Sequence, residues 1–357
     1  MSQRAAAARE LLAWFDRRAR DLPWRRTRDP YAIWVSEIML QQTRVDTVIP
    51  YYERFLARFP TPQALADAEV EEVLRHWSGL GYYRRARQLH LAAGEVVARY
   101  GGELPDSAEK LTDLPGIGRY TAGAIASIAH GEATPVVDGN VIRVLSRYCA
   151  LEGDMRSQKG QKEVWARAAE LLDEARPGDF NQAVMELGAT VCTPRQPSCA
   201  ECPLALGCRA RREGRVEELP RLAPKKKPRR EPLQAAVVTR ADRVLLAQRG
   251  PDGLFAGLWE PPMIAVGDGP LSLRALGIAS ALALQATGEV RHVLSHLALE
   301  IAVHHAEAPR AFRLPRPPAG VPYVAYGWRR PAEVPLSTLA RKVLAAPRPG
   351  ASVEASA

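Results

Sequence analysis

Four cysteines gather near the middle of this chain, at Cys192, Cys199, Cys202 and Cys208. Four thiolates in so short a segment suit either a tetrahedral zinc ion or a [4Fe–4S] cluster. Zinc sites of four cysteines usually combine two close pairs across a longer loop. The spacing here, Cys-x6-Cys-x2-Cys-x5-Cys, contains a single close pair and wraps once around a larger object, so we predict a [4Fe–4S] cluster. The fifth cysteine, Cys149, is predicted to be buried as a small apolar residue.

The size and charge of the chain indicate several domains and a polyanionic partner. Its 357 residues exceed what one hydrophobic core usually holds. The 49 Lys and Arg against 40 Asp and Glu give a formal net charge of +9, which favours nucleic acid. The sequence has no apolar run long enough to cross a bilayer and no apolar core of a signal peptide. We therefore expect no membrane association and a cytoplasmic, nucleoid-associated location.

The first 210 or so residues are predicted to be almost entirely helical. Asp29 and Thr61 are favoured N-cap residues, and each precedes a proline at the first helical position. Gly79 and Gly101 stand where helices are expected to end.

A second pattern follows a basic, proline-rich stretch. The hydrophobic period changes to two, which predicts strands. These strands are expected in AAVVTR (235–240), DRVLLAQR (242–249), 290–294, 297–303 and 323–328, with helices near 271–286 and 335–346. The predicted organisation is a helical region at 1–215, a basic linker at 216–232, an α+β domain at 233–346 and a disordered tail at 347–357.

Gly116 and Gly118 lie in Leu-Pro-Gly-Ile-Gly (114–118), between two predicted helices. Backbone N–H groups exposed at the start of a helix bind a phosphate oxygen without reading base sequence. A glycine pair alone is often only a tight turn. Between two helices of a basic protein, it resembles a helix-hairpin-helix element.

Two carboxylates have both a structural and a functional explanation. Asp138 precedes a predicted helix at 140–149, where aspartate is a favoured N-cap. Glu37 lies among the apolar residues of segment 34–40, where a buried carboxylate is unfavourable unless it is partnered or protonated. Glu37 is either the polar edge of an amphipathic helix, together with Gln41, or a general acid with a raised pKa.

Six segments and the four cysteines together resemble the helix-hairpin-helix base-excision glycosylases with an iron–sulfur loop, the endonuclease III superfamily. Within it, the MutY-type adenine glycosylases are most similar. The segments are LPWR (22–25), RDPYAIWVSEIMLQQTRV (28–45), GLGYYRRAR (79–87), LPGIGRYTAGAI (114–125), VDGNVIRVL (137–145) and FNQAVMELGATVC (180–192). The resemblance extends from about residue 10 to residue 345.

The resemblance implies an all-α core of two helical subdomains followed by a C-terminal α+β Nudix-like domain. One subdomain would hold residues 23–130 with the helix-hairpin-helix element. The other would hold residues 1–22 and 131–215 with the [4Fe–4S] loop. Duplex DNA would bind in the cleft between the two subdomains, with the target base flipped out. The protein would act as a monomer. Glu37 and Asp138 would face each other across that cleft.

The resemblance also implies a chemical role for the two carboxylates. The adenine anion is a poor leaving group, so a ring nitrogen of adenine must be protonated before the base departs. Glu37 would act as the acid in this step and later as the base that takes a proton from water. Asp138 would stabilise or attack the oxocarbenium-like sugar. Tyr120 and Asn140 would orient this pair. Bifunctional members carry a lysine at position 120, and a phenol forms no imine, so a monofunctional glycosylase is expected.

Further residues would bind the nucleotide and the DNA by the same resemblance. Trp24 and Arg25 would line the adenine pocket. Gln42 and Tyr82 match the positions that wedge beside the lesion base. From the sequence alone, an exposed helix end and a core aromatic are the alternative explanations for these two side chains.

The C-terminal domain resembles the Nudix-like lesion-recognition domain of adenine glycosylases. Nudix hydrolases hold magnesium with a glutamate-rich helix, but residues 271–286 include no acidic residue. Pyrophosphate hydrolysis is therefore not expected. Leu294-Ser295-His296 matches a Phe-Ser-His turn that contacts 8-oxoguanine in the family. Leu294 can wedge beside a base but cannot stack on it as phenylalanine does.

The expected substrate is adenine paired with 8-oxoguanine, and less efficiently with guanine, in duplex DNA. Two alternatives stay open. One is a thymine or uracil mismatch glycosylase, because tyrosine at position 120 also occurs in iron–sulfur thymine mismatch glycosylases. The other is a non-catalytic damage-binding protein that uses its cluster as a redox sensor.

Overall fold

The computed structural model describes residues 3–224, 227–266, 271, 273–278 and 282–347. They divide into two compact units. The first unit comprises Met1–Asp67 and Gln88–Lys225, and the second comprises Ala68–Arg87 and Lys226–Ala357. This division differs from the predicted domains, since residues 68–87 group with the C-terminal part of the chain. Residues 348–357 of the predicted tail lie outside the described residues.

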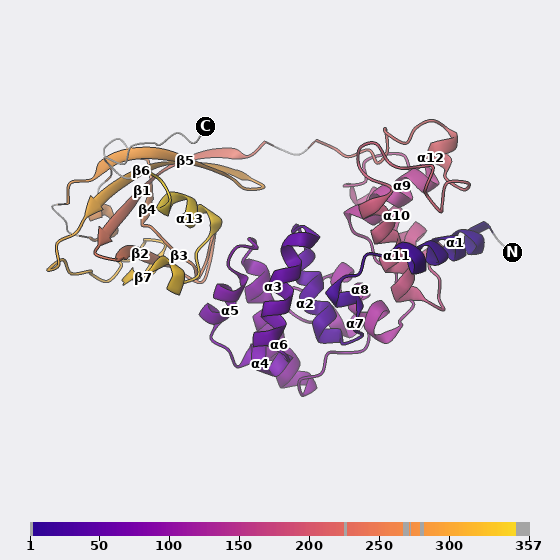
Figure 1. The fold of residues 1–357 in the computed structure, drawn as a ribbon, viewed down its shortest axis with the longest axis horizontal. Helices are drawn as coiled ribbons and strands as arrows, with labels where there is room; N and C mark the ends of the chain where they lie inside the picture. The colour runs from indigo at the N-terminus through magenta and orange to yellow at the C-terminus, as the bar shows by residue number, and fades with distance from the viewer. Residues whose placement is uncertain (1–2, 225–226, 267–270, 272, 279–281, 348–357) are drawn as a thin grey trace. The chain divides into compact units, whose positions relative to one another are not determined.

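The described part of the first unit is helical, as its sequence predicts (Figure 1). Helix α6 (Arg84–Tyr100) begins in the second unit and continues into the first. The remaining elements are α1 (Gln3–Arg18), η1 (Pro23–Arg25), α2 (Pro30–Leu40), α3 (Val45–Arg58), α4 (Pro62–Ala66), α7 (Ala108–Leu111), α8 (Arg119–His130), α9 (Gly139–Cys149), α10 (Gln158–Leu171), α11 (Pro177–Thr190) and α12 (Arg209–Arg212).

The predicted helix boundaries are confirmed by their caps. The carboxylate of Asp29 accepts hydrogen bonds from the N–H groups of Tyr31 and Ala32, and proline follows it at the start of α2. Thr61 caps α4 in the same way. Helix α6 ends directly before Gly101, whose φ of +65° suits glycine.

The helices of the first unit pack in two groups. Helix α2 is buried from Tyr31 to Met39 and contacts α3 and α8. Helices α1, α9, α10 and α11 surround a second core, and α11 also contacts α8. Large members of that second core are Leu11, Phe15, Val144, Met155, Val164, Phe180 and Leu187. The N-terminal ends of α8 and α9 and one side of α2 and α11 are thereby brought around a common cavity.

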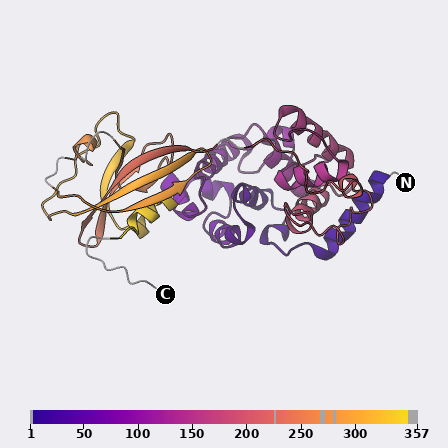
Figure 2. The same cartoon turned by 90° about the horizontal axis from the view of Figure 1, so that it is seen from above.

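The second unit contains a seven-stranded mixed sheet with the strand order β3-β2-β1-β6-β5, in which β4 also pairs with β1 and β7 with β2. Strands β1 and β6 are parallel, and the other pairs are antiparallel. Figure 2 gives a second view of these strands. The bounds are β1 (Arg229–Arg240), β2 (Arg243–Arg249), β3 (Trp259–Glu260), β4 (Met263–Ala265), β5 (Gln285–Val293), β6 (Leu297–Glu307) and β7 (Tyr323–Arg329).

Each face of this sheet carries its own apolar core. Helix α13 (Thr338–Leu344) packs against β1 and β5, with Leu339 and Val343 in one core. The other core includes Leu273 and Leu276 of the short 3-10 helix η2 (Leu273–Leu276). Helix α5 (Val70–Trp77) also belongs to this unit.

The prediction of a helix near 271–286 is wrong for the described residues of that segment. The expected helix is reduced to η2, after which Gly277 adopts a φ of +71°, and the segment from Gln285 onward joins β5. Residues 272 and 279–281 lie outside the described part of the chain. The alanine and leucine content satisfies helical periodicity locally. The left-handed glycine and burial against the sheet decide otherwise, since tertiary contacts override weak propensity.

None of the described helices combines the length and the apolar character needed to cross a membrane.

Candidate active site

A cavity of about 620 Å³ lies within the first unit, among α2, α11 and the N-terminal ends of α8 and α9. Most of the residues predicted for catalysis and substrate binding line it, although they come from distant parts of the sequence. They are Trp24, Arg25, Glu37, Gln42, Gly116, Gly118, Tyr120, Asp138 and Asn140. The structure also places Arg20, Gln182, Met185 and Glu186 on the same cavity.

Glu37 is the buried carboxylate of this cavity. It is 5% exposed on helix α2, and its Oε2 accepts a hydrogen bond of 2.7 Å from the hydroxyl of Tyr120. Burial raises the pKa of Glu37 to about 7; the Tyr120 hydrogen bond opposes this shift, and the charge of Asp138 adds to it. Glu37 is therefore not the solvated edge of an amphipathic helix.

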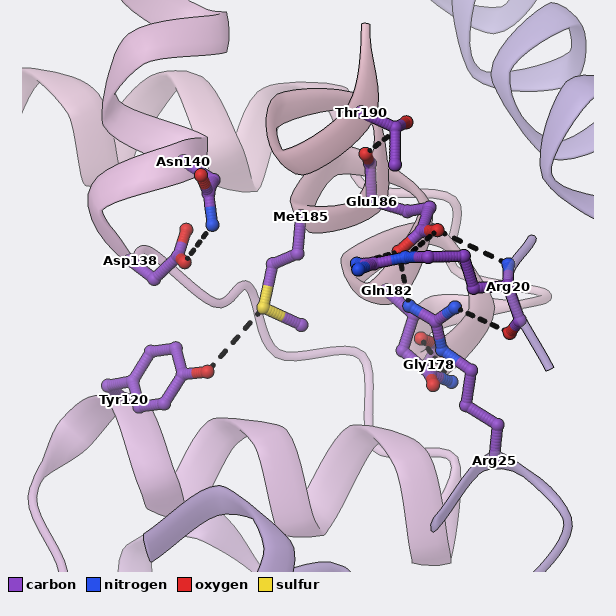
Figure 3. A network of polar contacts seen from close by, with 10 residues as sticks. All are labelled: Arg20, Arg25, Tyr120, Asp138, Asn140, Gly178, Gln182, Met185, Glu186 and Thr190. Carbon is purple, nitrogen blue, oxygen red and sulfur yellow. Dashed lines mark hydrogen bonds and ion pairs between the residues drawn. The ribbon is translucent and has the colours of Figure 1, made fainter. Parts of the chain in front are cut away.

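Asp138 has two functions in the local structure, one for each carboxylate oxygen. Oδ1 accepts a hydrogen bond of 2.7 Å from the N–H of Val141 and caps α9. Oδ2 accepts a bond of 2.9 Å from the side-chain amide of Asn140 (Figure 3). Burial raises the pKa of Asp138, although these hydrogen bonds oppose the shift. The cap predicted at this position and a place in the cavity are thus compatible.

Tyr120 lies at the start of α8, with its hydroxyl bonded to one of the two carboxylates, Glu37. Its hydroxyl donates to Glu37. The same hydroxyl lies 3.5 Å from the sulfur of Met185 on α11 (Figure 3). Burial, followed by the charges of Glu37 and Asp138, raises the pKa of Tyr120 well above its usual range. The side chain is consequently a neutral phenol that donates its proton to a hydrogen bond throughout the physiological pH range.

A buried ion-pair network lies beside this group and was not predicted from the sequence. The carboxylate of Glu186, 1% exposed, accepts hydrogen bonds from Arg20 Nε at 2.7 Å, Arg20 Nη2 at 2.8 Å and Arg25 Nη2 at 2.9 Å (Figure 3). Burial alone would raise the pKa of Glu186, but the two arginines outweigh it and lower that pKa. Glu186 thereby fixes Arg25 at the cavity wall. Glu186 lies among apolar residues at 183–187, a sequence pattern that indicates a buried carboxylate, as it does for Glu37.

Three other predicted residues have distinct surroundings. Trp24 is buried, with its ring edge-on to Tyr52 at a centroid distance of 5.5 Å. Gln42 is exposed just after α2, at a φ of +58°. Gly116 has a φ of +77°, and a Cβ added there would lie 2.6 Å from Cβ of Gln88, so the hairpin turn requires glycine.

The remaining predicted binding residues belong to the second unit. Tyr82 is 47% exposed, with a φ of +47°, so it is not a core aromatic. Leu294, Ser295 and His296 form the turn between β5 and β6, which is closed by a hydrogen bond of 2.7 Å from Leu294 N to the Leu297 carbonyl. Leu294 packs at the edge of a core, while Ser295 and His296 are exposed.

The four cysteines lie around one pocket in the first unit. Cys192 follows α11, Cys208 is the N-cap residue of α12, and all four are free and partly buried. Arg147, 2% exposed, lines the same pocket and lies 3.4 Å from the sulfur of Cys192 through its Nη1. A buried guanidinium beside sulfur suits a pocket of negatively charged thiolates.

The donor set of this pocket, four thiols, fits a [4Fe–4S] cluster. Among the residues that the structure describes, no group of three or more Cys, His, Asp or Glu side chains could hold one metal ion. A [4Fe–4S] cluster takes one thiolate per iron, so its ligands stand farther apart than the four ligands of one zinc ion. All four cysteines line one shared pocket.

Comparisons with known proteins agree with this architecture. A family model described as "HhH-GPD superfamily base excision DNA repair protein" matches residues 35–172, and a NUDIX domain model matches residues 234–346. The adenine DNA glycosylase of Rattus norvegicus is 44% identical, covering 84% of this chain and 70% of that protein. The adenine DNA glycosylase of Mus musculus is 41% identical, covering 93% of this chain and 76% of that protein. That of Homo sapiens is 43% identical, covering 82% of this chain and 65% of its own length.

Two solved structures resemble the helical part. A thermostable thymine-DNA glycosylase has a TM-score of 0.55 at 31% identity, covering 59% of this chain and 97% of that one. An endonuclease III in a non-covalent DNA complex has a TM-score of 0.51 at 23% identity, covering 60% and 99%, which shows a common fold.

The helical unit with its hairpin and its carboxylate cavity, together with the Nudix-like domain, defines a DNA glycosylase of the helix-hairpin-helix base-excision class. Within that class, the chain belongs to the adenine DNA glycosylase family.

Proposed function

We propose that this protein hydrolyses the N-glycosidic bond of adenine paired with 8-oxoguanine, and less efficiently with guanine, after flipping the adenine out of duplex DNA. The observation that carries the proposal is the pair formed by Glu37 and Tyr120. A carboxyl group with a pKa of about 7, oriented by a neutral phenol in a cavity shared with Asp138, is suited to protonate a leaving base.

Glu37 supplies the proton in the first step. With a pKa of about 7, roughly half of the molecules hold that proton at neutral pH. Because Oε2 accepts the Tyr120 hydroxyl, the proton is carried on Oε1 toward a ring nitrogen of adenine. The bond between the sugar C1′ and the adenine nitrogen then breaks, and its electron pair leaves with the protonated base.

Asp138 acts on the positive charge that develops at the sugar. Its two oxygens are held by Val141 N and the Asn140 amide, so the carboxylate is fixed before the substrate arrives. After adenine leaves, the ionised Glu37 accepts a proton from water, and the water oxygen forms the new bond to C1′. The two carboxylates thus divide the acid–base and charge-stabilising roles.

Tyr120 limits the reaction to base removal. A lyase step requires an amine that forms a Schiff base with the sugar, and position 120 carries a phenol. The protein is therefore proposed to be monofunctional. Borohydride is expected to trap no covalent protein–DNA adduct.

Other residues bind the base and the duplex in this proposal. Trp24 and the Glu186-bound Arg25 line the adenine pocket. The backbone around Gly116 and Gly118 binds phosphate, and Gln42 and Tyr82 wedge beside the lesion pair. Leu294, Ser295 and His296 recognise 8-oxoguanine.

Cys192, Cys199, Cys202 and Cys208 are proposed to hold a [4Fe–4S] cluster. When bound, the cluster supplies a cross-link that stabilises the fold and a redox-active group. None of the base-removal steps requires it. Arg195 of the cysteine loop and Arg209, Arg211 and Arg212 of α12 are exposed, and their charges suit contact with phosphates.

The test is cleavage of duplexes with adenine opposite 8-oxoguanine or guanine, read as strand breaks after hot alkali. The cluster-loaded wild type is expected to cleave both, the 8-oxoguanine duplex faster. Glu37→Gln is expected to bind the duplex and to lose between about a hundredfold and ten-thousandfold in base release. The absence of cleavage by the wild type would refute the proposal. Cleavage that is unchanged in Glu37→Gln would refute the role of Glu37 as the acid. A non-catalytic damage-binding protein would show no cleavage at all and the same duplex binding in the wild type and in Glu37→Gln.

A thymine mismatch activity is the second candidate. It is favoured by Tyr120 and by the 31% identity to a thymine-DNA glycosylase. Cleavage of duplexes with thymine opposite guanine, but not of adenine opposite 8-oxoguanine, would establish it in place of the adenine activity.

A further inference from the structure

The turn that carries Tyr82 has an unusual backbone. This turn, Ser78–Tyr83, connects α5 to α6 in the second unit and includes three residues with left-handed φ: Gly79 at +116°, Gly81 at +71° and Tyr82 at +47°. Glycine adopts such angles without steric cost, but tyrosine does not. A strained tyrosine persists only where its surroundings hold it. The contacts that hold this turn therefore matter for the place of the exposed Tyr82 ring.

Part of the support comes from the helices that flank the turn. Trp77 Nε1 donates to the Gly81 carbonyl at 3.2 Å. Arg85 donates from Nη2 to the carbonyls of Leu80 at 3.3 Å and Gly81 at 3.2 Å. The Arg85 guanidinium also lies 5.6 Å from the centroid of the Tyr82 ring, as a cation–π contact. These bonds fix the middle of the turn.

The ends of the turn are fixed by the C-terminal part of the chain. The carbonyl of Leu336 accepts one hydrogen bond of 2.9 Å from Ser78 Oγ and another of 3.0 Å from the Tyr83 hydroxyl. That hydroxyl also accepts a bond of 3.2 Å from the N–H of Gly79. Arg341 of α13 donates to Ser78 Oγ at 2.9 Å. One buried carbonyl thus ties both ends of the turn.

Leu336 itself is held by the sheet. It is 1% exposed and forms an isolated bridge with Trp259 of β3, whose N–H donates to the Pro335 carbonyl at 3.0 Å. The indole of Trp259 also donates to Glu71 of α5 at 3.0 Å. The Ser78–Tyr83 turn is consequently attached to a buried residue that is itself bridged to the sheet.

We propose that the segment around Leu336 and Arg341 orders the Tyr82 turn, with Ser78 and Tyr83 as positioning residues for recognition of the mispair. The C-terminal domain then does more than contact the lesion base: it keeps the wedge in its strained, binding-competent conformation before DNA arrives. The inference rests on the proposed function, because that function assigns Tyr82 as a wedge. Preorganisation of this kind increases affinity by raising the fraction of molecules that can bind.

The test removes the bridging hydroxyl with Tyr83→Phe in the full-length, cluster-loaded protein. The ring remains, while the bonds to Leu336 and Gly79 are lost. The matched control is Tyr326→Phe, which removes a hydroxyl bonded to the Leu276 carbonyl at 2.8 Å in the same unit. Two readouts are compared: single-turnover base release as a function of protein concentration, and unstacking of 2-aminopurine placed opposite 8-oxoguanine, followed by fluorescence.

Tyr83→Phe is expected to raise the protein concentration for half-maximal base release by about five- to thirtyfold, as the loss of two hydrogen bonds predicts. The 2-aminopurine signal is expected to shift to the same higher concentration. The rate at saturation should stay within about twofold, since Glu37, Tyr120 and Asp138 are untouched. Affinity for an undamaged duplex and the behaviour of Tyr326→Phe are expected to match the wild type.

Three results would overturn the inference: no change with Tyr83→Phe, an equal change with Tyr326→Phe, or an equal loss of affinity for undamaged duplex. If Tyr83→Phe does not fold, Ser78→Ala makes the same comparison, because it removes the bonds to Leu336 and Arg341. A wild type that releases no adenine refutes the proposed function instead. The 2-aminopurine comparison does not depend on base release and still decides the positioning role.

Discussion

Replacement of Glu37 by glutamine should make the protein more stable as it removes the activity. The folded protein holds this carboxyl at a pKa of about 7, against 4.5 for an unperturbed glutamate, and burial is the main cause. Such a difference costs about 3 kcal/mol of folding free energy once the carboxyl is ionised. Glutamine keeps a carbonyl oxygen that accepts the Tyr120 hydroxyl and has no proton to lose. The gain should therefore reach about 3 kcal/mol.

The pH dependence distinguishes this cause from ordinary repacking. Below pH 4.5 the carboxyl is protonated in the folded and the unfolded chain. As the pH rises from 4.5 to about 7, the unfolded chain ionises while the folded protein keeps its proton, so the stability of the wild type falls. Above this pH window, the carboxyl is ionised in both the folded and the unfolded chain, and the loss of stability stays constant. The difference between Glu37→Gln and the wild type should thus grow with pH and then level off.

The assay is urea unfolding of both proteins at a series of pH values from 5 to 9, followed by tryptophan fluorescence, with base release measured on the same samples. Asp21→Asn is a suitable control, because Asp21 is an exposed carboxylate paired with Arg26 outside the cavity. A stability difference that is the same at every pH would refute the reasoning. So would a wild type that becomes more stable between pH 5 and 7 relative to Glu37→Gln.

Three further predictions address the neighbours of this group. Tyr120→Phe removes a hydrogen bond that lowers the pKa of Glu37, so the alkaline midpoint of the base-release profile should move up by about one pH unit; a downward shift would contradict this. Glu186→Gln leaves Arg20 and Arg25 without their buried charge partner and should cost about 3 kcal/mol in urea unfolding, whereas no loss would exclude a buried ion pair at this position. Cys199→Ser should lower the visible absorbance of the cluster and the affinity for DNA. The rate of base release at saturating protein should be affected less. A variant that binds DNA normally but fails only in chemistry would contradict that order.

Several structural features were predictable from the sequence because they depend on neighbouring residues. The caps at Asp29, Thr61 and Asp138 need only a side-chain oxygen and the following N–H groups. The hairpin at Gly116 and the change to a period of two before β1 are also local patterns. The failure at 271–286 has the complementary cause. In the described residues of this segment, burial of Leu273, Leu276 and Ile278 against a sheet, which the segment itself does not encode, decides the conformation.

The sequence by itself determined that a phenol stands at position 120, that four cysteines are spaced Cys-x6-Cys-x2-Cys-x5-Cys, and that Glu37 lies in an apolar segment. Only the tertiary structure decided that Glu37 is a buried carboxyl group with a raised pKa. Its pKa depends on the removal of water by α2, α8, α9 and α11, which surround the cavity, and on a hydroxyl 83 residues away. The pairing of Glu186 with Arg20 and Arg25 across more than 160 residues was equally hidden. Desolvation and long-range pairing act between side chains that only folding brings together, so a local pattern can suggest such groups but cannot fix their charge.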